Sequence, residues 1–329
     1  MTETLTESTD ARTGRPASAN GAGSGYDEVF ERHRQVLLGL AYRMLGSWWD
    51  AEDTVQEAWL RWQRATAGPD AAPIDDPRGW LVTATTRLAL DQLRSARHRR
   101  ETYVGPWVPE PVPTGRLALD PAETAAQRST VSLAALRLME QLSPPERAVF
   151  LLREAFELPY QDIADALGIE AANARQLHRR ASGRLDRDRD RFRVDSSEHH
   201  ALVDRFVAAA ASGDRKGLES LLARDVVLWN DGGGRVSAAR NPIHGPDRVV
   251  RFLLGVMDRW PLTRAHRVEV NGGPALLLDF ATVRLLLSFE TRDGAIAGVQ
   301  GVVNPDKLRN VVTPDREPYF ELASVAFRH

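Results

Sequence analysis

The sequence predicts a multidomain chain in which two all-α helical units, the second with a helix-turn-helix, precede an α+β unit. Three observations predict this. Apolar side chains recur at helical spacing through the first half, a proline-rich stretch divides that half in two, and strand-like apolar runs fill the last third. With 329 residues, the chain is long enough for two or three compact domains.

The composition excludes several classes of protein. The chain is 43% hydrophobic and 27% charged, as ordinary globular proteins are, and it lacks an apolar run long enough to span a bilayer. It contains no cysteine, which excludes disulfides and thiolate metal sites, and we expect neither a metal nor a cofactor. The net charge of -2 argues against a uniformly basic coat for nucleic acid. We expect a cytoplasmic protein without a membrane partner.

Residues 1–25 are polar and rich in Gly, Ser and Thr, which predicts a disordered tail. Residues 26–100 form the first predicted helical unit. Apolar residues recur at helical spacing from Tyr26 to Leu45, and Asp50 is expected to cap a second helix, residues 50–65. One face of that helix is apolar, with Val55, Ala58, Trp59 and Trp62, and the other is acidic, with Glu52, Asp53 and Glu57.

A third helix is predicted to start at Asp76 and Pro77 and to end in a basic segment. The basic residues are Arg87, Arg94, Arg97, His98, Arg99 and Arg100. Favourable charge at a helix C-terminus explains this segment, and so does a surface that follows phosphates. The pattern alone does not separate the two interpretations.

Residues 101–128 are predicted to be a linker. Its prolines at 106, 109, 111 and 113 forbid a continuous helix and favour extended backbone. Tyr103 and Trp107 add aromatic side chains that can attach the segment to a neighbouring surface. We therefore expect a semi-rigid linker with points of contact.

Residues 129–190 predict a helix-turn-helix. Ser143 and Glu146 form a capping-box pattern, and Gly168 can take the left-handed turn between a short helix and a longer basic one. In such a motif the second helix enters the major groove, where Arg, Asn and Gln read bases and phosphates. Its candidate DNA-binding residues are Asn173, Arg175, Gln176, His178, Arg179, Arg180 and Arg184. An arginine-rich surface hairpin is the alternative.

Residues 26–190 resemble the two core domains of bacterial extracytoplasmic-function (ECF) sigma factors of the sigma-70 family. The resemblance rests on "YRMLGSWWDAEDTVQEAWLRW", "DDPRGWLVTATTRLALDQLRSARHRR" and "LSPPERAVFLLREAFELPYQDIADALG". It implies a transcription initiation factor without a reaction of its own. The implied partners are core RNA polymerase, through its β′ clamp and β flap, and promoter DNA.

The same resemblance implies roles for particular residues. Those expected to dock on the β′ clamp are Asp50, Glu52, Asp53, Gln56, Glu57, Trp59 and Trp62. Those expected at the melted −10 element are Trp80, Arg87, Asp91, Arg94 and Arg97. The helix from Glu170 to Arg184 would bind the −35 element.

Residues 198–329 predict helices followed by antiparallel strands, hence an α+β layer arrangement. The stretches "ETYVGPWVPEP", "NDGGGR" and "NPDKL" resemble motifs of a sigma-J-like subgroup whose chains carry a SnoaL-like C-terminal extension, a cone-shaped sheet around helices. Here Arg235 stands where the subgroup often has lysine, and Val108 where it usually has leucine.

"NDGGGR" allows three interpretations. A phosphate loop lacks the required glycine spacing. A catalytic pocket would use Asp231 as general base with His244 or His266 assisting. The favoured interpretation is a structured turn that contacts the sigma core, in which Asp231 and Arg235 pair with each other or bind a partner.

We hypothesise that the extension regulates the sigma factor in cis by binding the linker. The candidate contact residues are Trp107, Pro109, Glu110, Pro111, Asp231, Gly232, Gly233, Gly234, Arg235, Asn304, Pro305, Asp306, Lys307 and Leu308. For the last five, a solvent-exposed turn is an equal alternative. The competing functions are a fused SnoaL-type isomerase or hydrolase, a sensor that binds a small molecule in the C-terminal pocket, and an ordinary helix-turn-helix repressor.

Overall fold

The computed structural model describes residues 21–67, 72–117, 130–185, 196–311 and 320–321. Most of the predicted N-terminal tail, residues 1–20, lies outside this part of the chain, as do 118–129 of the linker. None of the described helices is both long enough and apolar enough to cross a bilayer.

The first helical unit consists of α1 (Gly21–Leu45), α2 (Trp48–Thr66) and α3 (Pro77–Glu101). Helix α1 begins at Gly21, inside the segment predicted as a disordered tail, because helical hydrogen bonding continues beyond the packed part of a helix. Helix α2 begins two residues before the predicted cap. Its N-cap is Ser47, whose side chain accepts a hydrogen bond from the backbone N–H of Asp50, so Asp50 is a first-turn residue and not the cap.

The second helical unit consists of α5 (Leu133–Met139), α6 (Pro144–Glu154), α7 (Tyr160–Leu167) and α8 (Ala171–Leu185). The capping box of Ser143 and Glu146 is present at the start of α6. Gly168 ends α7 with a φ of 66°, a left-handed conformation that glycine adopts without steric cost. Helices α7 and α8 thus form the predicted helix-turn-helix. The 3-10 turn η1 (Thr114–Arg116) lies in the linker before this unit.

The α+β unit begins with α9 (Ser196–Ala211) and α10 (Arg215–Leu221). Its strands are β1 (Leu222–Asp231), β2 (Ile243–His244), β3 (Leu262–Val270), β4 (Gly273–Phe280), β5 (Arg284–Arg292), β6 (Ala295–Val302) and β7 (Phe320–Glu321). They form one sheet in the order β2-β1-β6-β5-β4-β3-β7, and β1 and β6 run parallel. Helix α11 (Pro246–Arg259), between β2 and β3, was not predicted.

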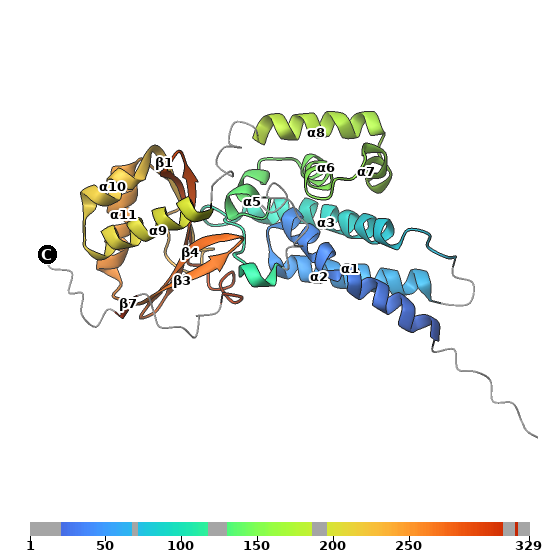
Figure 1. Ribbon diagram of the computed structural model, residues 1–329, viewed down its shortest axis with the longest axis horizontal. Helices are drawn as coiled ribbons and strands as arrows, with labels where there is room; N and C mark the ends of the chain where they lie inside the picture. The colour runs from blue at the N-terminus through green and yellow to red at the C-terminus, as the bar shows by residue number, and fades with distance from the viewer. Residues whose placement is uncertain (1–20, 68–71, 118–129, 186–195, 312–319, 322–329) are drawn as a thin grey trace, which may run out of the picture.

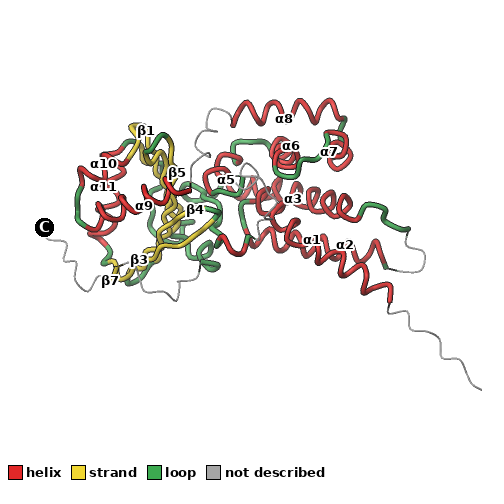
Figure 2. The backbone as a smooth tube through the Cα atoms, in the orientation of Figure 1, coloured by secondary structure: helices red, strands yellow, loops and turns green. Residues whose placement is uncertain are grey.

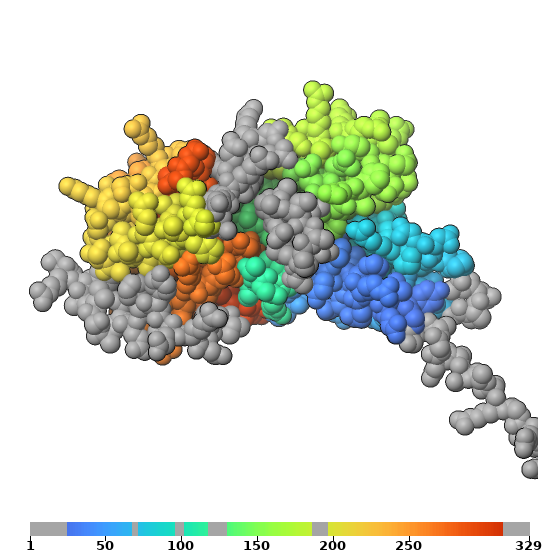
Figure 3. All heavy atoms as spheres, viewed as in Figure 1, coloured from blue at the N-terminus to red at the C-terminus, as the bar shows by residue number. Residues whose placement is uncertain are grey.

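The two faces of this sheet have different partners. One face packs on the helices of its own unit, in a core that includes Phe206, Val250 and Leu287. The other face buries Leu277 and Leu286 together with linker and α5 residues. Figures 1 and 2 show the α+β unit at one end of the molecule, with α5 between its sheet and the helical units. Figure 3 shows these parts in close contact.

This architecture confirms the predicted fold class: two helical units, the second with a helix-turn-helix, followed by an α+β unit. The arrangement also brings the linker against the second face of the sheet. The site described next lies there.

Candidate functional site

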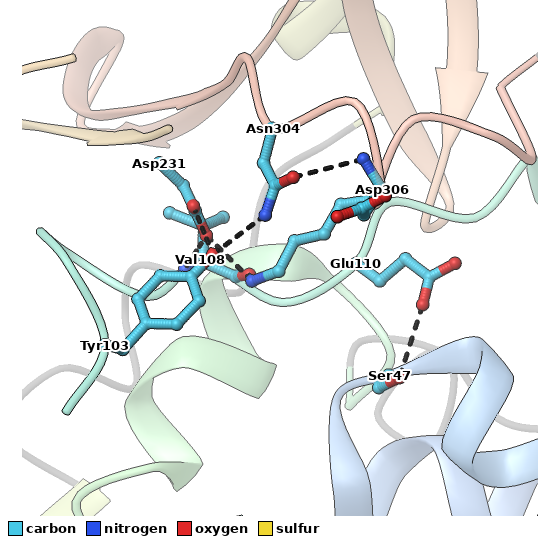
Figure 4. A network of polar contacts seen from close by, with 8 residues as sticks. Ser47, Tyr103, Val108, Glu110, Asp231, Asn304 and Asp306 are labelled. Carbon is cyan, nitrogen blue, oxygen red and sulfur yellow. Dashed lines mark hydrogen bonds and ion pairs between the residues drawn. The ribbon is translucent and has the colours of Figure 1, made fainter. Parts of the chain in front are cut away.

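Asp231, the last residue of β1, binds the linker at the edge of the sheet. Its side chain is fully buried, and its Oδ1 accepts a hydrogen bond from the Tyr103 hydroxyl at 2.6 Å. Its Oδ2 accepts from the Val108 backbone N–H at 2.9 Å and from Lys307 Nζ at 2.7 Å. Figure 4 shows Tyr103 and Val108 converging on this carboxylate. One acidic side chain therefore joins the linker to the C-terminal segment.

Lys307 neutralises Asp231 inside the same contact. Its ammonium also donates to the carbonyl oxygen of Val108 and lies 4.2 Å from the centre of the Trp107 ring. A cation above an indole face is attracted by the ring quadrupole. Burial, reinforced by the negative charge of Asp231, raises the pKa of Tyr103 well above its usual range, so this phenol stays a hydrogen-bond donor.

The glycines of "NDGGGR" allow the chain to turn sharply beside this contact. Gly233 and Gly234 have φ values of 56° and 71°. A Cβ atom on Gly233 would lie 2.2 Å from Asn304 Nδ2 and 2.9 Å from the Tyr103 hydroxyl, which Asn304 Nδ2 hydrogen-bonds at 3.0 Å. The glycines thus serve a close approach between three segments.

Arg235 does not pair with Asp231, which was one of the predicted alternatives. Its Nε lies 3.3 Å from Asp306 Oδ2, and both side chains are largely exposed. Pro305 is also exposed, whereas Leu308 is buried against the linker-facing side of the sheet. Asp231 pairs instead with Lys307, five residues after the end of β6, because the flexible lysine side chain reaches the buried carboxylate.

Glu110 fixes the other end of the linker motif. Its backbone N–H donates to the carbonyl oxygen of Gly46 at 2.8 Å, next to the start of α2. Its Oε2 accepts from the Trp48 N–H at 2.8 Å, and its Oε1 accepts from Asn310 Nδ2 at 2.9 Å. Figure 4 shows this side chain reaching toward Ser47. Burial raises the pKa of Glu110, although these hydrogen bonds oppose the change. Pro109 and Pro111, on either side, are buried as well.

A second contact joins α5 to the sheet. Arg137 Nη2 lies 2.8 Å from Glu290 Oε1, and both side chains are nearly inaccessible to solvent. The Arg137 guanidinium also stacks 3.6 Å from the centre of the Trp229 ring. Sequence reasoning missed all three residues. These three residues belong to no recognisable sequence motif. Their contact depends on how α5 packs against the sheet of the α+β unit.

The structure does not assemble the proposed catalytic group around Asp231. His266 lies on β3, four strand positions from β1, or roughly 19 Å at the usual strand spacing. His244 is exposed and pairs in register with Val227, four residues before Asp231. The carboxylate itself already accepts three hydrogen bonds, which leaves it poorly placed to accept a proton from a substrate.

The recognition helix α8 separates its candidate residues into two groups. The exposed ones are Asn173, Arg175, Gln176, Arg179, Arg180 and Arg184. His178 instead points inward, where its ring bonds the Tyr160 hydroxyl at 3.0 Å and Glu154 Oε1 at 3.1 Å. Arg184 pairs with the capping-box residue Glu146 at 2.8 Å. His178 is therefore held within its own helical unit in this conformation, whereas Arg184 pairs with Glu146 and still leaves more than half of its side chain exposed.

The candidate residues of α3 differ in the same way. Asp91 and Arg94 form an exposed ion pair at 3.2 Å. Arg87 donates to the carbonyl oxygens of Ala166 and Asp165 at the end of α7, at 2.8 and 3.1 Å, and so connects the two helical units. Trp80 packs edge-on against Trp62, with ring centres 5.4 Å apart. The side chain of Arg97 lies outside the described residues.

The candidate polymerase surface of α2 also needs a correction. Asp53 and Gln56 are exposed, and Asp50, Glu52 and Glu57 are partly so. Trp62 is fully buried and donates its indole N–H to the Tyr26 carbonyl oxygen, so it stabilises the helical core and offers no surface. Trp59 is half-buried against Phe30. Trp49 and Leu60, which were not predicted, are exposed.

Residues 29–99 match the model of Sigma-70 region 2, and residues 132–185 match that of Sigma-70 region 4. The ECF RNA polymerase sigma factor SigJ of Mycobacterium tuberculosis is 39% identical over 291 residues, which cover 85% of this chain and 92% of SigJ. The probable ECF sigma factor SigI of the same species is 36% identical over 285 residues, covering 85% of this chain and 93% of SigI. The crystal structure of SigJ superimposes with a TM-score of 0.70 at 35% identity, covering 86% of this chain and 98% of that one.

Proposed function

Because the chain belongs to the ECF RNA polymerase sigma factors, which direct promoter-specific transcription initiation, we propose that its α+β unit regulates initiation in cis by holding the linker. The observation that carries this proposal is the set of hydrogen bonds from the linker to Asp231 and from Lys307 to the linker. Because this function requires RNA polymerase, we also propose that the protein acts in the cytoplasm.

We assign the exposed face of α2, with Asp53 and Gln56, to the β′ clamp of polymerase. Helix α3, with Asp91 and Arg94, is assigned to the −10 element. The exposed residues of α8 are assigned to the −35 element, where a helix-turn-helix places its second helix in the major groove. The second helical unit would also contact the β flap.

The compact arrangement supports regulation through the linker. The −35 and −10 elements lie about 25 base pairs apart, which corresponds to about 85 Å of duplex at 3.4 Å per base pair. In the structure α3 touches α7 through Arg87, so the two helical units lie side by side. Binding both elements therefore requires the units to separate, and the linker between them has to move. The α+β unit holds that linker at Asp231 and contacts Glu110 through Asn310.

The test compares transcription by reconstituted holoenzymes on a promoter mapped with the full-length chain. Asp231→Asn keeps the shape of the side chain but removes the charge that faces Lys307, and a chain that ends at residue 197 lacks the whole α+β unit. We expect both to change promoter output. The matched control is Asp247→Asn in α11, because Asp247 also forms an ion pair, with Arg215 at 2.6 Å, but is exposed. Unchanged output from both Asp231→Asn and the truncated chain would contradict the proposal.

A further inference from the structure

The turn between β3 and β4 reaches into the junction of the two helical units and the linker. Asn271 and Gly272 form this turn with φ values of 54° and 78°, the pattern of a tight hairpin in which both central residues are left-handed. Such a turn normally lies in solvent. Here the Asn271 side chain is buried, and the Gly272 N–H donates to Thr114 Oγ1 of the linker at 3.1 Å.

The Asn271 side chain makes a hydrogen bond to each of the three parts. Its Nδ2 donates to the Tyr42 hydroxyl of α1 at 2.6 Å and to the Val131 carbonyl oxygen, just before α5, at 2.8 Å. Its Oδ1 accepts from the Val112 N–H of the linker at 2.9 Å, and its own N–H donates back to the Val112 carbonyl oxygen at 2.9 Å. Both donors and the acceptor of the amide are therefore used.

Tyr42 extends this group of contacts to the linker motif. Its hydroxyl accepts from Asn271 and donates to the Glu110 carbonyl oxygen at 2.6 Å. Burial raises the pKa of Tyr42 far above its usual range, so the hydroxyl keeps the proton that it donates. Glu110 and Val112 lie in the linker before η1, and Val131 lies just before α5. A single amide thus contacts the first helical unit, the linker and the entry to the second unit.

We propose that Asn271 is a positioning residue through which the α+β unit sets the separation of the two DNA-binding units. This inference rests on the proposed function and names the residue that transmits it. An amide is suited to the role because it supplies two donors and one acceptor on one rigid group. An aspartate of the same shape would place an oxygen against the Val131 carbonyl oxygen, and like partial charges would then repel.

The chain offers a matched control in its other tight hairpin. Asp293 and Gly294, between β5 and β6, have φ values of 52° and 71°, nearly those of Asn271 and Gly272. Asp293 is exposed. Asn271→Asp therefore creates an Asp-Gly turn that this sheet already contains, and Asn271→Gly removes the side chain from a backbone that glycine adopts freely. Neither substitution strains the turn.

The experiment measures the distance between the helical units in the free protein. The chain contains no cysteine, so Gln63→Cys in α2 and Gly183→Cys in α8 provide two exposed, unique sites for spin labels. We expect pulsed electron resonance to give a narrow distance distribution for the labelled parent chain and for Asp293→Gly. Asn271→Asp and Asn271→Gly should add a population at longer distance. Tyr42→Phe, which removes only the hydroxyl, should shift the distribution in the same direction.

Two outcomes separate this inference from the proposed function. If Asn271→Asp, Asn271→Gly and Tyr42→Phe all keep the parent distribution while circular dichroism shows them folded, the positioning role is wrong, even if Asp231→Asn changes promoter output. If the Asn271 variants lengthen the distance between the spin labels but promoter output stays at the parent level, the positioning role of Asn271 is confirmed. The proposal that the α+β unit regulates initiation in cis is then wrong. A loss of fold in Asn271→Asp leaves the test to Tyr42→Phe, which keeps the buried ring.

Discussion

Two buried carboxylates hold the linker, and the protein stabilises them in different ways. Asp231 has a cation, Lys307, at 2.7 Å and hydrogen bonds from the linker. Glu110 depends on hydrogen bonds from Trp48, Ser47 and Asn310. A buried charge without a counter-ion carries a larger desolvation cost. We therefore expect the stability of the docked linker to depend on pH through Glu110.

The first prediction concerns Glu110→Gln. Because burial raises the pKa of Glu110 in the folded protein, the folded state binds this proton more tightly than the unfolded chain does. The stabilisation that comes from protonated Glu110 is complete below the pKa of this group in the unfolded chain, about 4.3. It is lost as pH rises through the higher pKa of Glu110 in the folded protein. Glutamine does not titrate. The free energy of unfolding of the wild type, measured against that of Glu110→Gln in urea, should thus fall with rising pH. A pH-independent difference between the two proteins would contradict the assigned shift.

Lysine at position 307 illustrates how residue type follows from the site. Lys216 and Lys307 are the two lysines of a chain whose other basic residues, apart from histidine, are arginines. The ammonium of Lys307 lies between Asp231 Oδ2, the Val108 carbonyl oxygen and the Trp107 ring. A compact point charge fits partners arranged around it, whereas a planar guanidinium needs them in one plane. Composition alone gave no sign of this.

At the scale of single elements, α8 combines two roles on one helix. Arg179 and Arg180 are exposed, while Arg184, one turn further, pairs with the buried Glu146. Hydrogen bonds from Ser143 and the charge of Arg184 lower the pKa of Glu146 against the opposing effect of burial. The same residue type is therefore proposed to bind DNA at one position, while at another it pairs with the start of α6.

Substitutions in α8 should separate these roles. Arg180→Ala is expected to weaken binding of the holoenzyme to −35 DNA by about 1–3 kcal/mol, if a base contact is lost, without lowering the thermal midpoint. Arg184→Ala should lower the thermal midpoint, because it leaves Glu146 without its cation. Gel-shift titration of the holoenzyme and thermal unfolding of the free chain measure the two effects. If Arg180→Ala and Arg184→Ala lost DNA binding equally and were equally stable, the proposed difference between the roles of Arg180 and Arg184 would be wrong.

Local sequence signals predicted most of the helices and strands. The capping box at Ser143, the turn at Gly168 and the hairpin glycines each act within a few residues, so the sequence pattern reveals them. Helix α11 was missed although Pro246 stands at its first turn and Val249, Val250 and Leu253 form an apolar stripe. The parallel pairing of β1 with β6 carries no local signal, because it joins strands more than sixty residues apart.

The site was predictable only in part for the same reason. The resemblance pointed to the three motifs, and in the structure the linker motif contacts Asp231 and Lys307 directly. Asn271 stands before two glycines, a pattern typical of a tight turn, but its partners Tyr42, Val112 and Val131 are between 140 and 229 positions away. Only the packing of the sheet against the helical units brings them together. Long-range polar contacts of this kind leave little trace in residue spacing.

At the scale of the whole molecule, the two helical units are held together by direct contacts as well as by the α+β unit. Arg147 of α6 donates to the Arg43 carbonyl oxygen of α1 at 2.9 Å. Arg87 of α3 donates to carbonyl oxygens at the end of α7, where the helix dipole favours a cation. The linker contacts then keep the units from drifting apart. Arg87, which we propose as a contact to promoter DNA, is thus used here in a contact between the two helical units.

Arg87→Ala should therefore have two effects. In the free chain it removes a direct contact between the helical units, so the distance between spin labels at positions 63 and 183 should lengthen. In the holoenzyme we expect it to remove one phosphate contact to the melted −10 strand, so the slope of log binding constant against log salt should decrease in magnitude by about 0.7. Arg94→Ala is the matched variant, since Arg94 lies on the same helix and pairs with Asp91 at 3.2 Å. It should change the salt dependence and leave the distance unaltered. If Arg87→Ala kept the distance of the parent chain, the contact between Arg87 and α7 would not be what holds the two helical units side by side. Release of the linker alone would then have to separate them.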